Sequence, residues 1–158
     1  MEYRRYLEYM RTTPMAAIQA LVVGLLVGFM VHVGTLGLQQ YALDPLFCQQ
    51  NNDQYCSSTG QIAAVLSIVV FHFLGLVALV RIGVIRPLLV VLATVVTLFG
   101  LHVWLGGQTW WMGALYSALL VGISYLYYTW INRMTLFPVA LGFTIVSVII
   151  ARLLLSYS

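Results

Sequence analysis

Residues 14–39 read PMAAIQALVVGLLVGFMVHVGTLGLQ and contain no Asp, Glu, Lys or Arg. A helix needs about 20 apolar residues to cross the hydrocarbon core of a bilayer, so this stretch is long enough to span it. Its length, and the absence of a small-residue cleavage site after it, argue against a cleavable signal peptide. The stretch therefore predicts a transmembrane helix.

The composition of the whole chain is that of a membrane protein. Of the 158 residues, 62% are hydrophobic and only 7% are charged, and the mean hydropathy is +0.97. Soluble domains average about 25% charged residues, so these values exclude a water-soluble globule as well as a disordered chain. The net charge of +3 is too small and too scattered to indicate nucleic-acid binding.

Four further apolar segments follow the first, and none of them alternates in the manner of a barrel strand. We therefore predict an all-α integral membrane protein, a bundle of five transmembrane helices in one membrane domain, residues 14–158. A cytoplasmic interfacial segment, residues 1–13, precedes it. The predicted spans are residues 14–39, 60–80, 87–105, 109–130 and 136–157, with an outer loop over residues 40–59.

The arginines predict the orientation of this bundle. If the helices alternate in direction, six of the seven arginines fall on the side of the N-terminus, and Asp44 and Asp53 fall on the other side. Basic residues are enriched on the cytoplasmic side of membrane proteins. We therefore expect a cytoplasmic N-terminus and a periplasmic C-terminus, in a bacterial inner membrane that the chain crosses several times.

Cys48 and Cys56 are the only two cysteines, and both lie in the predicted outer loop. Paired thiols on the outer side of a membrane form disulfides. Their spacing is wider than that of the close pairs in disulfide-exchange enzymes, and one pair supplies too few ligands for zinc. The sequence therefore predicts a structural disulfide and no metal site.

His32, His72 and His102 lie within predicted spans, and Arg152 lies in the outer part of the fifth span. Ionisable side chains at membrane depth are candidates for ligand binding. Each histidine is either a neutral ring bonded to a backbone carbonyl or a hydroxyl group, or a residue that binds haem or a quinone. Arg152 either extends to the interface, pairs with Asp44, or binds the phosphate of a lipid or another anionic ligand.

Small residues predict where helices pack. Lipid tails provide no hydrophobic drive between helices, so close helix contacts in membranes depend on such residues. Gly24 and Gly28 form a GxxxG motif, and Gly75, Gly113 and Ser117 mark faces in later spans. The sequence leaves open whether these faces meet within one chain or between subunits.

Three functions remain open. The first is a non-enzymatic accessory, assembly or regulatory component that packs against partner subunits, because the spans contain packing surfaces and no Asp, Glu or Lys. The second is a small homo-oligomeric transporter, channel or lipid-handling protein for an anionic ligand near Arg152, although neither a buried acidic group nor an interrupted helix is evident. The third is a haem- or quinone-binding redox protein using the histidines. Membrane lipids, with partner subunits or further copies of the chain, are the expected partners, and no cofactor is expected under the first reading.

Overall fold

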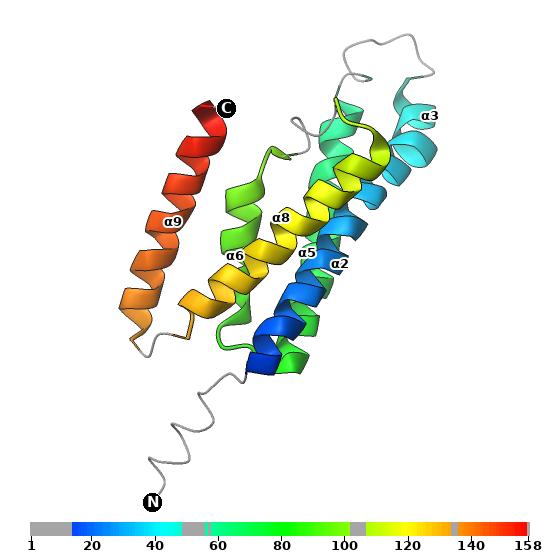
Figure 1. Cartoon of the computed structure of the whole chain (residues 1–158). Coiled ribbons are helices and arrows are strands. Elements are labelled where there is room, and N and C mark those ends of the chain that lie inside the picture. The colour runs from blue at the N-terminus through cyan, green and yellow to red at the C-terminus, as the bar shows by residue number, and fades with distance from the viewer. Residues whose placement is uncertain (1–13, 49–55, 57, 102–106, 134–135, 158) are drawn as a thin grey trace, which may run out of the picture.

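The computed structural model describes residues 14–48, 56, 58–101, 107–133 and 136–157, and all regular structure in these residues is helical (Figure 1). The expected interfacial segment 1–13, His102 and Asp53 lie outside the described residues. Three helical stretches are long and apolar enough to cross a membrane. These stretches are Met15–Phe47, Thr59–Ile82 and Trp110–Ile131; two further apolar stretches are shorter, the helix Pro87–Leu98 and the part Phe137–Leu153 of the last helix.

The long helices alternate in direction along one bundle, and α9 lies to one side of it, next to α6 (Figure 1). We call the end that carries the Cys48–Cys56 bridge the disulfide end. The boundaries of α5, α8 and α9 agree with the predicted spans to within two residues. The main helices are α2 (Pro14–Leu38), α5 (Thr59–Ile82), α6 (Pro87–Leu98), α8 (Trp110–Ile131) and α9 (Phe137–Tyr157).

The first helix continues beyond its predicted end. After α2 comes a π-helical turn, η1 (Gln39–Leu43), and then a short helix, α3 (Asp44–Phe47). The expectation of a loop over residues 40–59 is therefore wrong for its first part. No glycine interrupts this segment, and Pro45 falls in the first turn of α3, where the missing N–H costs no hydrogen bond.

The centre of the bundle is the contact between α2 and α8, which lie against each other along most of their length. A Cβ atom at Gly24 would lie 2.8 Å from Cα of Gly122, and one at Gly28 would overlap the backbone of Ser117. The Ser117 hydroxyl donates a hydrogen bond of 2.8 Å to the Gly28 carbonyl across this contact. The predicted GxxxG face therefore packs within the chain, against α8.

The helix α6 ends at Leu98, seven residues before the predicted end of its span at Leu105. Phe99 has an extended backbone, and Gly100 has φ +92, a conformation that favours glycine. The 12 residues of α6 rise only about 18 Å along the helix axis, which is less than the roughly 30 Å thickness of the hydrocarbon core of a bilayer. The sequence therefore failed to indicate that this helix ends at Leu98.

Long side chains hold α9 to the rest of the protein. The guanidinium of Arg86, just before α6, lies 4.8 Å from the centre of the Phe137 ring. Towards the disulfide end, Arg152 donates a hydrogen bond to the carbonyl of Phe99. Between these two contacts the hydroxyl groups of Tyr127 and Ser147 lie 2.9 Å apart. Most other described side chains of α9 are exposed, apart from Ala140 and Thr144.

Candidate ligand-binding cavity

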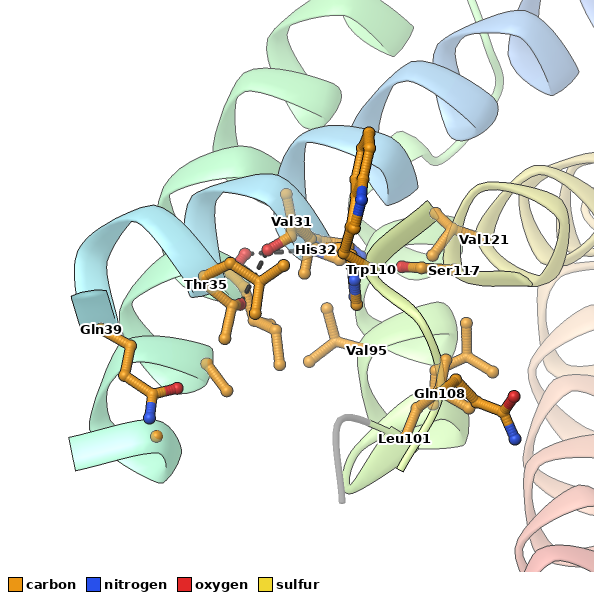
Figure 2. A pocket seen from close by; sticks show the side chains of 16 residues that line it. Val31, His32, Thr35, Gln39, Val95, Leu101, Gln108, Trp110, Ser117 and Val121 are labelled. Carbon is orange, nitrogen blue, oxygen red and sulfur yellow. Dashed lines mark hydrogen bonds between the residues drawn. The ribbon is translucent and has the colours of Figure 1, made fainter. Parts of the chain in front are cut away.

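A cavity of about 280 Å³ lies between α2, α5, α6 and α8, towards the disulfide end of the bundle. In Figure 2 its wall is formed by side chains from separate helices, among them Thr35 of α2, Val95 of α6 and Trp110 of α8. None of the described lining residues is Asp, Glu, Lys or Arg. The full lining is Val31, His32, Thr35, Leu36, Gln39, Gly60, Ala64, Ile68, His72, Val95, Leu98, Leu101, Gln108, Trp110, Ser117 and Val121.

The polarity of the cavity changes with depth. Gln39, Gly60 and Gln108 lie near the helix termini at the disulfide end, where the wall contains two side-chain amides. From Gly60 to His72 the wall extends along α5 for about 18 Å at 1.5 Å per residue. Because neighbouring helices alternate in direction, the deepest lining residues are the last on α5 and α8 and the first on α2 and α6. These are His72, Val121, Val31 and Val95.

His32 enters the cavity wall through the α2–α8 contact. Its ring packs directly on Gly113, where any larger residue would occupy the position of the imidazole, and it lies within hydrogen-bonding reach of the Trp110 backbone. The Nε2 atom is buried and has no hydrogen-bond partner. The absence of a side chain at Gly113 leaves enough room for the ring to reach α8.

His72 is the deepest polar residue of the wall, and its side chain is only 5% exposed. Its Nδ1 atom lies 3.0 Å from the carbonyl oxygen of Ile68, one turn earlier in α5. Its Nε2 atom is buried without a partner. The ring of Tyr125 packs edge-on against it, with centroids 6.2 Å apart, and the Tyr125 hydroxyl is also buried without a partner.

The hydrogen bond to Ile68 determines the role of the second ring nitrogen. A carbonyl oxygen only accepts hydrogen bonds, so Nδ1 of His72 carries a hydrogen. A charged ring at this depth would need an anionic partner, and the described wall offers none. In the neutral ring, Nε2 is therefore a hydrogen-bond acceptor.

The disulfide predicted from the sequence is present, with an S–S distance of 2.06 Å between Cys48 and Cys56. It joins the end of α3 to the residues before α5. Beside it, the hydroxyl of Thr59 donates a hydrogen bond of 2.8 Å to the Asp44 carboxylate. These two links hold the end of the first helical segment next to α5, close to where Gln39 and Gly60 border the cavity.

The structure does not pair Arg152 with Asp44. The partner of Arg152 is the Phe99 carbonyl, which follows α6 and has no place in the helical hydrogen-bond pattern. Asp44 instead accepts a hydrogen bond from Thr59. Neither residue lines the cavity, so an anionic ligand at Arg152 would occupy a different place from a ligand of His32 and His72.

The cavity brings together His32, His72 and Ser117 of the residues singled out from the sequence, whereas Gly24, Gly28 and Gly75 pack helices elsewhere. Sequence reasoning missed Thr35, and it missed the two lining amides, Gln39 and Gln108. Only one feature of the sequence could have indicated Gln39 and Gln108. Both are amides at or next to the ends of predicted spans, and those ends are predicted to lie on the same side of the membrane. Among the described residues, no three His, Cys, Asp or Glu side chains form a cluster able to hold a metal ion.

Comparison of the chain with protein families, with curated proteins and with solved structures finds no significant match.

Proposed function

We propose that this protein binds a small lipophilic molecule within the membrane, in the cavity between α2, α5, α6 and α8. One observation carries the proposal. Two histidine rings line an uncharged cavity, and the Nε2 atom of each is buried without a hydrogen-bond partner. Leaving a buried polar atom unpaired costs about 1–3 kcal/mol, so such atoms are usually paired with protein, water or ligand.

The dimensions of the cavity support a small ligand. Pockets for drug-sized molecules measure about 300–1,000 Å³ and are mostly apolar with a few polar groups. At about 280 Å³ this cavity lies just below that range, and it combines valine and leucine side chains with two imidazoles, two amides and two hydroxyls. The second function considered from the sequence, a lipid-handling protein, is the one that this site favours, although at a different place from Arg152.

The proposed arrangement in the membrane is five membrane-crossing segments, of which the third is helical over α6 for only part of the crossing, with the disulfide end on the periplasmic side of a bacterial inner membrane. Three arginines at the ends of α5 and α8 opposite the disulfide support this orientation: Arg81 lies in the last turn of α5, Arg86 follows α5, and Arg133 follows α8. In this arrangement a ligand enters either from the periplasmic side, past Gln39 and Gln108, or sideways from the outer leaflet. The accessory role in a larger assembly stays a prediction, and no described contact tests it.

The test compares two phenylalanine substitutions at adjacent positions of α6. Val95 lines the cavity and is half-buried, whereas Val96 is 50% exposed and does not line the cavity. Protein purified in mild detergent is extracted with organic solvent, and the extracts are compared by mass spectrometry. We expect one small molecule to co-purify with the wild-type protein and with Val96→Phe, and to be lost with Val95→Phe. Identical extracts from all three proteins would contradict the proposal.

A further inference from the structure

We infer that the ligand is a neutral molecule that carries a hydroxyl group at the end that lies deepest in the cavity. This hydroxyl donates a hydrogen bond to Nε2 of His72. The inference rests on the proposed function and names the chemistry of the ligand. It follows from the tautomer of His72, from the apolar surroundings at the deep end of the cavity and from the absence of charge in its described wall.

The tautomer determines which partner His72 accepts. Because Nδ1 donates to the Ile68 carbonyl, Nε2 has a lone pair and no hydrogen. A ketone, an ether or a quinone carbonyl offers only acceptors and leaves Nε2 unpaired. An alcohol, a phenol or a quinol offers the O–H that Nε2 requires.

The surroundings of His72 favour the hydroxyl of an organic molecule over a cluster of water molecules. At its level the wall contributes Val31, Val95 and Val121, none of which forms side-chain hydrogen bonds. A buried water needs about two to four polar partners; these valines supply none, and the Tyr125 hydroxyl beside the ring does not line the cavity. A hydroxyl attached to an apolar body needs only the imidazole nitrogen, and its body gains contact with the valines.

The described wall of the cavity contains no charged side chain, and this excludes an ionised ligand. A carboxylate, phosphate or ammonium group in the cavity would face only neutral described side chains and would lose its hydration. The two amides at the disulfide end, Gln39 and Gln108, are suited to a second neutral polar group near the entrance.

The experiment uses a pair of probes that differ in one hydrogen-bond donor. Binding of 4-hexylphenol and of its methyl ether to the full chain in detergent micelles is measured by calorimetry, with empty micelles as the reference for partitioning. We expect the wild-type protein to bind the phenol about tenfold more tightly than the ether, which corresponds to about 1.4 kcal/mol, within the range of one neutral hydrogen bond.

Variants assign this preference to one atom. His72→Leu should bind both probes equally, and His72→Gln, whose amide oxygen accepts hydrogen bonds, should keep part of the preference. Tyr125→Phe is the matched control, because its hydroxyl is the other unpaired buried group beside the His72 ring. Tyr125→Phe should leave the preference unchanged, and a loss of preference in Tyr125→Phe alone would overturn the inference.

The outcomes separate the inference from the proposed function. If neither probe binds more to the protein than to empty micelles, or if Val95→Phe binds them as well as the wild type, the proposed function fails. If both probes bind equally and Val95→Phe abolishes binding, the cavity binds ligands but the role of His72 is wrong. ¹⁵N NMR of labelled histidine gives a second measurement, since a hydrogen on Nε2 of His72 would overturn the inference without any ligand.

Discussion

The contact between α2 and α8 and the attachment of α9 are two different ways of joining helices in one small protein. At the first, glycines bring two backbones together, and a serine hydroxyl bonds directly to the Gly28 carbonyl. At the second, Arg86, just before α6, reaches an aromatic ring of α9, and Arg152 of α9 reaches a carbonyl after α6. The first joint tolerates no added atoms, whereas the second depends on a few long side chains.

The largest effect is expected where the backbones are closest. Gly28→Ala places a methyl group on the backbone of Ser117 and Ala118, so the two helices must separate. We expect a loss of about 2–3 kcal/mol in the free energy of unfolding, in the range for overpacked cores, measured by SDS titration in mixed micelles. Gly142→Ala in α9 is the control, because no atom lies within 4 Å of its added Cβ. Equal losses in both variants would show that helix propensity, and not the contact, explains the effect.

A smaller and more local effect is expected at the second joint. Arg152→Leu removes the donor to the Phe99 carbonyl, so the end of α6 and the adjacent part of α9 should loosen. We expect about 1 kcal/mol, typical of one hydrogen bond, seen as faster amide hydrogen exchange in α9 while α2 and α8 stay protected. Arg152→Lys should restore the protection only in part, because an ammonium lacks the reach and planar donors of the guanidinium. Faster exchange throughout the bundle would contradict a local role.

The smallest effect tests whether close packing or the hydrogen bond dominates at the first joint. Ser117→Ala removes the donor to Gly28 and leaves the small size of the residue unchanged. Hydrogen bonds between membrane helices contribute about 0.6 kcal/mol on average, so the loss should be well below that of Gly28→Ala in the same SDS titration. A loss as large as that of Gly28→Ala would assign the strength of the joint to the hydroxyl.

The two joints also differ in how well the sequence predicted them. The GxxxG motif identified the face of α2 correctly, because close approach requires small residues regardless of the partner helix. It did not identify α8 as the partner, since five apolar helices offer many pairings of similar faces. The disulfide was predictable because only two cysteines exist and both fall in one segment.

There is a physical reason why the end of α6 could not be predicted from the sequence. Gly100 marks that end, yet Gly24, Gly28 and Gly75 lie inside continuous helices, so glycine alone does not distinguish the two cases. What stabilises the terminus is a donor 53 residues later in the sequence, Arg152. The cavity could not be predicted for the same reason. Its wall combines side chains from four helices, and the sequence alone does not show which helices are neighbours in the fold.

The pairing of α2 with α8 has a consequence for biosynthesis. Gly28 and its partner Ser117 are separated by 89 positions in the chain. At about 5–20 residues per second, a ribosome takes roughly 4–18 s to make that interval. During this time α2 is in the membrane while the helix that covers its glycine face does not yet exist. That face is then exposed to lipid and to the same face of other nascent copies, so crowded expression should increase pairing between copies before each chain completes its own bundle.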